Sequence, residues 1–452
     1  MNLNSRKITR RSLLRGVGAG ALAVAASPML FDSKTAFAAP AAAPAAPGTP
    51  NNDRSGTLIV RPATGATIAQ INAKFGTQTV MTFTGTNQAL VWAPRVLFAL
   101  VKMKLDKQLV AWVELNSRVK TPRKRKRTLG AAEDSGSDGA ASLQVVNDPA
   151  AFFNQWGVAK IGLTAAQQRS KGAGITVAVI DTTVNPSHPT LAGKCVQGYD
   201  LVTGNVIANT ASDEDSGSDE DSGSDEDSGS DGTRALGGNH GTVTAGLVIL
   251  AAPDAKILPI RVLDDDGMGT TALVSEGIRR AADMGAKVIN LSLSTPTFSF
   301  ALADAVEYAV NKGAVLVAAY GNRGLPSPSV FPADLPNVVS VAATDQDDKK
   351  ASFSNYGAPC DVAAPGVNMV GPYAPGGWVV ASGTSFSCPL VAGQAALLLA
   401  APGGTPGLNV APSLLSGAVT NVLINTSNDI SVINLGDPGF PRVNVPRSLG
   451  LV

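Results

Sequence analysis

Hydrophobic residues follow two different patterns along the chain, and the change comes near residue 175. Beyond it, short runs rich in Val, Ile, Leu and Ala alternate with stretches whose apolar residues recur at helical spacing. The runs predict buried strands at 175–181, 256–263, 286–293, 314–320 and 338–344, and the stretches predict helices at 240–251, 271–284 and 300–312. Apolar strands that alternate with helices indicate an α/β fold, with a parallel sheet covered by helices on both faces.

Residues 56–120 come before this pattern and predict a small α+β domain. Its expected elements are strands at 57–61, 78–84, 88–93 and 109–115, and a helix at 67–75. Residues 121–146 combine the basic run 123–127 with a later acidic stretch, and we interpret them as a linker. A processing point in the basic run is the less favoured interpretation. The run contains no aromatic residue, which argues against nucleic-acid binding.

Residues 1–38 have the organisation of an export signal. Basic residues precede a small-residue run at 16–26, and the end of the segment fits a signal-peptidase site. The pair Arg10-Arg11 favours a twin-arginine signal over an ordinary secretory signal. No apolar run reaches the roughly 18 residues needed to span a bilayer, so we expect a secreted or extracytoplasmic protein without a membrane anchor. Residues 39–55 read as an Ala/Pro-rich linker.

Net charge is informative only when it is divided by segment. The 452 residues include 36 Lys and Arg against 35 Asp and Glu, which argues against a strongly basic nucleic-acid binder. Residues 39–130 carry fourteen basic and three acidic residues, whereas 131–452 carry sixteen basic and thirty-one acidic ones. Ten of the acidic residues fall in the Ser/Gly-rich insert 212–232, which we expect to be a disordered surface loop. The opposite charges of the two segments favour their association.

Four polar residues stand at the ends of predicted strands or at the starts of predicted helices. Asp181 and Asn322 follow buried strands, His240 begins a small-residue helix, and Ser385 begins a long apolar helix. Each has an ordinary structural interpretation, as a turn residue, a surface histidine or a helix N-cap. In parallel sheets, however, chemistry gathers at the carboxyl ends of the strands, so we expect these residues to lie near one another.

Together, these residue types can activate a serine. A serine hydroxyl is a poor nucleophile without a base, and an imidazole base needs a carboxylate to fix its tautomer. The oxyanion that forms needs donors, which the Asn322 amide and the Ser385 backbone N–H supply. His188 is the only other histidine and therefore the fallback base, although it follows Asp181 by only seven residues on a predicted turn.

These motifs resemble those of the subtilisin-like serine protease family. The matching segments, in the family's order, are 177–182, 239–242, 319–322, 361–366 and 383–385 with Pro389. The resemblance implies a subtilisin-like catalytic domain at 147–452 and a secreted endopeptidase. It also implies that Asp181, His240 and Ser385 form the catalytic triad and that Asn322 is the oxyanion donor.

The same resemblance implies the surroundings of the site. Ser292, Leu293 and Ser294 would belong to the substrate-binding strand, with Gly321 beside the oxyanion loop. Residues 56–120 resemble the family's inhibitory propeptide, and the start of the domain resembles thermitase-type mature enzymes. The implied partners are protein or peptide substrates and the protein's own propeptide, with no nucleic acid. We expect a monomer that needs no cofactor for its chemistry.

Some residues depart from the family's pattern. Thr183 stands where the family has glycine, and because a β-branched residue disfavours positive φ, we expect an altered turn after Asp181. Ser294 replaces a glycine of the main specificity pocket, and Tyr320 replaces a small residue. These two changes predict a narrowed pocket that disfavours large aromatic side chains.

A calcium site of the family is only half matched. Asp148 corresponds to one of its ligands, whereas Thr190 replaces an acidic one, so structural calcium is supported by Asp148 alone and no metal site is predicted. Cys388 is expected to be a small buried residue, and pairing of Cys195 with Cys360 stays open. The alternative function is a non-catalytic or narrowly specific protein on the same scaffold, motivated by Thr183 and the unusual pocket.

Overall fold

The computed structural model describes residues 56–121, 144–207, 236–374, 376–405, 407–430 and 441–452. These form two compact units. The smaller contains the described residues up to Thr82 together with Asn87–Val113, and the larger contains Phe83–Thr86 and the described residues from Glu114 onward. The expected export signal, the Ala/Pro linker and the acidic insert lie outside the described residues.

The smaller unit is a four-stranded sheet with two helices. The strands, in the order β2-β3-β1-β4, are β2 (Gln78–Thr82), β3 (Ala89–Trp92), β1 (Thr57–Pro62) and β4 (Val110–Leu115), and the helices are α2 (Ile68–Phe75) and α3 (Val96–Leu105). Thr67 and Gln70 form a capping box at the start of α2, and Gly76 ends the helix with a φ of 66°. The four strands and α2 match the elements that the sequence predicts for this stretch, and α3 is an additional helix.

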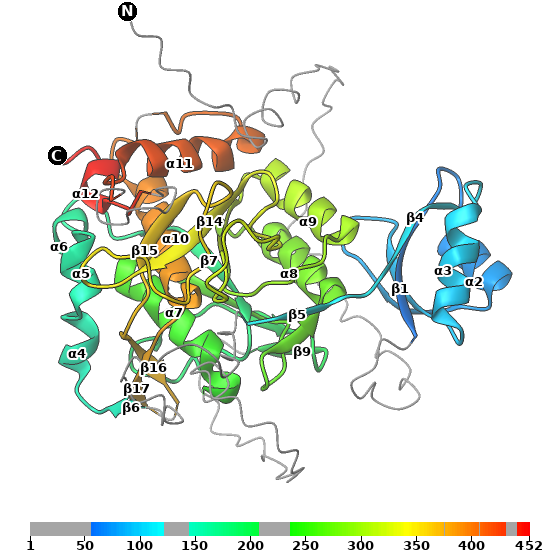
Figure 1. Ribbon diagram of the computed structural model, residues 1–452, viewed down its shortest axis with the longest axis horizontal. Coiled ribbons are helices and arrows are strands. Elements are labelled where there is room, and N and C mark those ends of the chain that lie inside the picture. The colour runs from blue at the N-terminus through cyan, green and yellow to red at the C-terminus, as the bar shows by residue number, and fades with distance from the viewer. Residues whose placement is uncertain (1–55, 122–143, 208–235, 375, 406, 431–440) are drawn as a thin grey trace, which may run out of the picture. The chain divides into compact units, whose positions relative to one another are not determined.

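The larger unit is built on an eight-stranded sheet, shown in Figure 1. Its strands, in spatial order, are β15 (Val362–Pro365), β14 (Val338–Thr344), β13 (Val315–Ala319), β12 (Val288–Leu291), β7 (Thr176–Asp181), β10 (Lys256–Arg261), β8 (Gly198–Asp200) and β9 (Asn205–Ile207). All neighbouring pairs are parallel except β8 and β9, which are antiparallel. The predicted parallel sheet is therefore confirmed.

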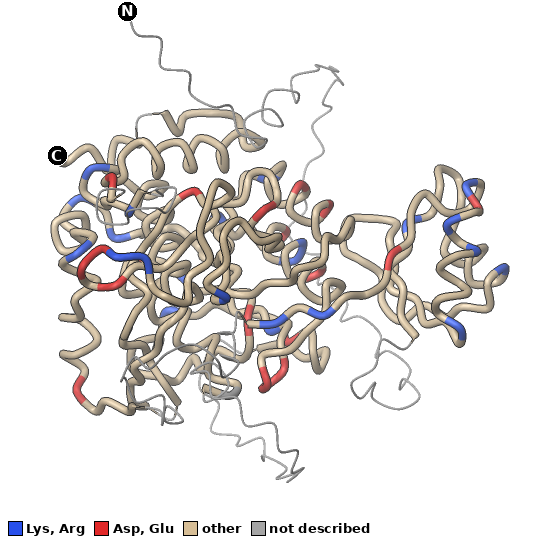
Figure 2. The backbone as a smooth tube through the Cα atoms, viewed as in Figure 1, with Lys and Arg blue, Asp and Glu red and all other residues tan. Residues whose placement is uncertain are grey.

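Helices cover both faces of this sheet. Successive strand residues point to opposite faces, so each strand contributes side chains to two cores. Val177 and Val179 of β7 pack in one core with α7 (His240–Ala251), α10 (Thr384–Ala400) and α11 (Pro412–Thr426). Ala178 and Ile180 pack in the other core with α8 (Thr271–Asp283) and α9 (Phe300–Asn311). Figure 2 shows that charged residues are absent along α7 and α10, whereas α8 and α9 carry them.

Smaller elements complete the larger unit. They are β16 (Met369–Tyr373), β17 (Gly377–Ala381), β6 (Gln144–Val146), β5 (Arg118–Lys120), β11 (Met268–Thr270), the 3-10 helix η1 (Gly237–Asn239) and the helices α4 (Pro149–Phe153), α5 (Trp156–Lys160), α6 (Leu163–Ala166) and α12 (Val445–Ser448). β6 lies inside the stretch expected to be a linker, where it extends the antiparallel β16-β17 pair. Among the described helices, none is long and apolar enough to cross a bilayer.

Candidate active site

Three chain segments bring Asp181, His240 and Ser385 to one side of the large sheet. Asp181 is the last residue of β7, His240 the first residue of α7 and Ser385 the second residue of α10. All three side chains are buried. An ionised carboxylate is costly to bury without a partner, so its contacts are informative about the site.

Asp181 and His240 form a direct pair. Nδ1 of His240 lies 2.7 Å from Oδ1 of Asp181, and Thr182 donates its backbone N–H to the same oxygen at 2.7 Å. The other carboxylate oxygen accepts a weaker contact from Thr244 at 3.5 Å. Because a carboxylate only accepts, Nδ1 carries the proton, and Nε2 of the neutral ring is left as the basic nitrogen.

Ser385 lies beside this pair without a hydrogen bond to it. Its Oγ is 3.5 Å from the carbonyl oxygen of Ser292, and no described group hydrogen-bonds to Nε2 of His240. The imidazole packs against the ring of Phe386, with centroids 5.6 Å apart. Since Phe386 follows Ser385 directly, the start of α10 is next to the base. Catalytic hydrogen bonds are often long before substrate binds.

The turn after Asp181 accommodates Thr183, where the family's pattern has glycine. Thr183 is exposed, and its φ is not positive. Thr182 ties the turn to the start of α7, because its Oγ1 donates to Gly238 and accepts from the N–H of Gly241. A Cβ on Gly241 would lie 2.5 Å from the Thr182 carbonyl oxygen, so only glycine fits there. Thr183 fits this turn without a positive φ, and the difference from the family's turn stays a prediction.

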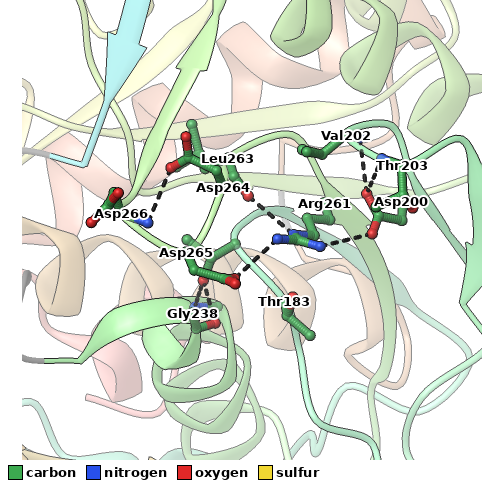
Figure 3. Close-up of polar contacts among 12 residues, drawn as sticks. Thr183, Asp200, Val202, Thr203, Gly238, Arg261, Leu263, Asp264, Asp265 and Asp266 are labelled. Atoms are coloured by element: carbon green, nitrogen blue, oxygen red, sulfur yellow. Dashed lines mark hydrogen bonds and ion pairs between the residues drawn. The ribbon is translucent and has the colours of Figure 1, made fainter. Parts of the chain in front are cut away.

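A cluster of charged residues lies at the ends of the neighbouring strands β10 and β8. Arg261, which pairs in register with Asp181, binds Asp200 at 2.9 Å and Asp265 at 3.0 Å. Figure 3 shows this guanidinium between the two carboxylates, with Thr183 nearby. Burial raises the pKa of the Asp264 carboxyl on the same loop, and the nearby Asp266 acts in the same direction. Arg261, the last residue of β10, thus links β8 through Asp200 and the loop after β10 through Asp265.

Asn322 follows β13 at the same edge of the sheet. Its Oδ1 accepts the backbone N–H of Thr384 at 2.9 Å and the Thr384 hydroxyl at 2.8 Å. These contacts fix the carboxamide so that Nδ2 points toward Gly383, where a Cβ would lie 3.0 Å from it. Gly321 has a φ of 93°, a conformation that side chains rarely adopt. An amide donor therefore stands beside the start of the helix that carries Ser385.

The predicted substrate-binding strand contacts both the serine helix and another strand of the chain. The Ser292 hydroxyl donates to the Ser385 carbonyl at 2.9 Å, and Leu293 is buried in the core. Ser294 exchanges two backbone hydrogen bonds with Lys120, at 3.1 and 2.7 Å. On its other side, β5 pairs antiparallel with β11. An extended strand of the same chain is thus held between two backbone edges, as bound peptides often are.

Other candidate residues lie apart from this arrangement. Both ring nitrogens of His188 are engaged elsewhere, since Nε2 contacts the Gly377 carbonyl at 2.8 Å and Nδ1 accepts from Thr190 at 3.1 Å. Asp148 caps α4 through the N–H of Ala150. No group of three or more His, Cys, Asp or Glu that suits a metal occurs in the described part of the chain.

The structure also shows where Tyr320 lies and whether the cysteines are paired. Tyr320 is fully buried in the core below the oxyanion loop, and its hydroxyl contacts the Pro328 carbonyl at 3.4 Å. Its ring therefore packs in the core, and its expected narrowing of the specificity pocket stays a prediction. All three cysteines are free. Sequence reasoning missed Thr182 and Thr244 as partners of the carboxylate, because short polar residues near a strand end have no distinctive pattern.

Comparison with known proteins gives consistent matches. The Subtilase family profile matches residues 172–442. Thermitase from Thermoactinomyces vulgaris is 43% identical over 262 residues, which cover 56% of this chain and 84% of thermitase. Subtilisin BL from Lederbergia lenta is 34% identical over 295 residues, which cover 63% of this chain and 95% of the relative.

A solved structure extends the likeness beyond the catalytic region. Fervidolysin from Fervidobacterium pennivorans, described as a keratinolytic enzyme related to subtilisin, matches with a TM-score of 0.66 and 25% identity. The match covers 87% of this chain and 61% of fervidolysin, so the chain spans about three fifths of that structure. With the buried Asp181–His240 pair, the profile match and the thermitase identity, this chain belongs to the subtilase family and is a serine-type endopeptidase.

Proposed function

We propose that this protein is exported and hydrolyses peptide bonds through an acyl-enzyme on Ser385. The observation that carries the proposal is the 2.7 Å contact between Asp181 and Nδ1 of His240. This contact leaves Nε2 as the proton acceptor beside the helix start that holds the serine. The segment 1–38 supplies the proposed export signal.

The first half of the reaction uses all three residues. His240 Nε2 takes the proton from the Ser385 hydroxyl as the oxygen attacks the peptide carbonyl carbon. Asp181 keeps the imidazole in the required tautomer and stabilises the imidazolium that forms. The imidazolium then gives its proton to the leaving amine as the C–N bond breaks, and the acyl group stays on Ser385. Water releases the acyl group in the second half, with His240 again as the base.

Charge develops on the carbonyl oxygen during both halves. Asn322 Nδ2 is positioned as a donor because Oδ1 of the same carboxamide is fixed by Thr384. The backbone N–H of Ser385, in the first turn of α10, is a second donor. Removing one such donor typically lowers kcat by about 10²–10³-fold. This chemistry requires no cofactor.

We further propose that residues 56–120 are an inhibitory propeptide and that the active form is a monomer. The pairing of Lys120 with Ser294 supports inhibition, since β5 occupies a place that an extended substrate would take. We retain the preference against large aromatic side chains in the specificity pocket, on the basis of Ser294 and Tyr320. A peptide panel cleaved best after Phe or Tyr would contradict that preference.

The experiment that tests the catalytic assignment compares two serine variants. Ser385→Ala is expected to abolish casein hydrolysis and labelling by a fluorophosphonate, and to leave the propeptide attached. Ser382→Ala, three residues earlier, removes a hydroxyl that contacts Asn368 and is expected to keep both activities. A Ser385→Ala protein that still matures and cleaves casein would show that the assignment is wrong.

A further inference from the structure

The chain from Glu114 to Thr121, here named segment 114–121, contacts more than the predicted substrate-binding strand 292–294. At its end, Lys120 pairs with Ser294, and Thr121 donates its N–H to Gly267 at 3.0 Å. At its start, Glu114 contacts the first turn of helix α9. Segment 114–121 therefore contacts both the substrate-binding strand and the N-terminus of a separate helix.

The first turn of α9 binds the Glu114 carboxylate with three donors. The Ser299 hydroxyl donates at 2.7 Å, the Phe300 N–H at 2.7 Å and the Ala301 N–H at 3.1 Å. The helix has no acidic residue of its own in this turn. Burial raises the pKa of Glu114, and the three donors act against this shift. The ligand at this helix start thus comes from a segment far away in sequence.

The neighbouring helix binds the same segment in a different way. At the start of α8, Oδ1 of Asn116 accepts the Ala272 N–H at 3.1 Å and contacts the Thr271 hydroxyl at 3.3 Å. A neutral amide is therefore sufficient at α8, whereas a carboxylate is seated at α9. Both oxygens of Glu114 accept hydrogen bonds at α9, whereas only the one oxygen of Asn116 accepts at α8, so the α9 contact is the one that requires two acceptor oxygens.

An exposed aromatic surface borders the α9 contact. The ring of Phe298 packs edge-on against Phe300 and Phe331, with centroids 5.1 and 5.5 Å apart. Phe298 is 46% exposed and Phe300 51% exposed while segment 114–121 is in place. Phe331 also pairs with Thr295, the residue after Ser294, at 2.9 Å in both directions. This surface therefore connects the α9 contact to the substrate-binding strand.

We propose that the start of α9 is a second peptide-binding site of the enzyme, which takes an acidic side chain of a protein substrate. The acidic residue lies six positions before the residue that pairs with Ser294, as Glu114 lies six positions before Lys120. This inference rests on the proposed function, because removal of the propeptide vacates the site. The enzyme then favours substrates with Asp or Glu at that position, upstream of the usual cleft contacts.

The test uses two fluorogenic peptides that carry residues 113–121 followed by one common cleavable tail. One peptide keeps Glu114 and the other has the isosteric Glu114→Gln. The active enzyme, produced by expression of the full chain, is expected to cleave the Glu peptide with a kcat/KM about tenfold higher, because the Gln side chain has one acceptor oxygen and leaves a donor of α9 without its acceptor. A ratio near one would overturn the proposal.

Two matched enzyme variants locate the effect at α9. Phe300→Pro removes the N–H that donates to the carboxylate, and proline is tolerated at this first helical position after the extended Ser299. Phe300→Ala removes the same ring and keeps the N–H. The Glu-to-Gln ratio is expected to fall to about two in Phe300→Pro and to persist in Phe300→Ala. Equal ratios in the two variants would overturn the assignment to α9.

The failure of the proposed function has a different signature. A short peptide that contains only Lys120, Thr121 and the common tail tests cleavage without the second site. If the enzyme cleaves this peptide and the ratio is near one, only the second site is wrong. If the short peptide is not cleaved and Ser385 takes no fluorophosphonate label, the proposed function is wrong and this inference falls with it.

Discussion

The two faces of the large sheet carry helices of opposite character. α7 and α10 on one face have no charged residue and are buried almost throughout. α8 and α9 on the other face keep polar and charged sides, including Glu276 and Arg280. α7 and α10 carry His240 and Ser385 in their first turns. α8 and α9 bind the chain segments around Thr84 and Glu114.

This difference shows how one sheet separates two tasks. A helix packed on all sides cannot shift without loss of close packing, so its first turn holds reactive groups at fixed positions. A helix with a polar side can bind and release another segment, because its polar groups bond to that segment in one state and to water in the other. Four predictions test this division, from the largest expected effect to the smallest.

The largest effect is expected on the buried face. Asp181→Asn should lower kcat by roughly 10⁴-fold, because the amide no longer holds the proton on Nδ1 of His240. The measurement is steady-state hydrolysis of a peptide substrate by each variant. Asp200→Asn, which alters a carboxylate bound to Arg261 and not to His240, is the control and should change kcat by less than tenfold. An Asp181→Asn enzyme of comparable activity would contradict the prediction.

A smaller effect is expected on the charged face. Glu276 accepts the Thr84 N–H at 2.8 Å and the Thr84 hydroxyl at 2.6 Å, and it also binds Arg280 at 2.7 Å. In the full chain with Ser385→Ala, which prevents processing, Glu276→Gln should speed amide hydrogen exchange at Thr84 by about tenfold. Glu307→Gln, at an exposed position of α9, should leave that exchange unchanged.

Low pH should lower the free energy of unfolding, because protonation of the buried His188 is unfavourable in the folded chain. This histidine packs against Trp378, and burial lowers its pKa below the ordinary 6.5. The unfolded chain therefore binds the proton first, and the free energy of unfolding should fall as pH drops through 6.5, by at most about 1.4 kcal/mol per pH unit. Urea unfolding between pH 7.5 and 5 measures this slope. His188→Asn should reduce it, and an unchanged slope would show that another group is responsible.

The smallest test concerns the thiols. Burial raises the pKa of Cys195 to about 11 and that of Cys388, in α10, to about 12. Cys360 is only partly buried. Iodoacetamide at pH 8 should therefore modify Cys360 well before the other two in the native protein, because the thiolate is the reactive form. Peptide mass spectrometry reads the order, and early modification of Cys388 would indicate that α10 opens.

Much of the fold was predictable because its signals are local. The apolar runs that became β7, β12, β13 and β14 needed burial on both faces, and this requirement is visible in each run alone. Thr67 and Gly76 marked both ends of α2. By contrast, the short strands β5, β6 and β11 form through partners distant in sequence, so no local pattern predicted them.

The candidate site divides in the same way. Strand ends and helix starts indicated Asp181, His240, Asn322 and Ser385, whereas the effects expected of Thr183 on its turn and of Tyr320 on the pocket stay predictions. Thr183 does not have a positive φ, and the close contacts of that turn are made by Thr182 and Gly241. Tyr320 directly follows β13 and is fully buried in the core. The direction in which a side chain points depends on neighbouring strands, and these are not visible in a single segment.

The sequence by itself determined the α/β class, the order of the reactive residues and the family resemblance, because periodicity and motif spacing are properties of the chain. Only the tertiary structure decided that Asp181 meets Nδ1 of His240 and that Glu114 reaches the start of α9. These contacts join residues 59 and 186 positions apart. Such pairs form only when the sheet and the helices on both of its faces pack together, so no local rule specifies them.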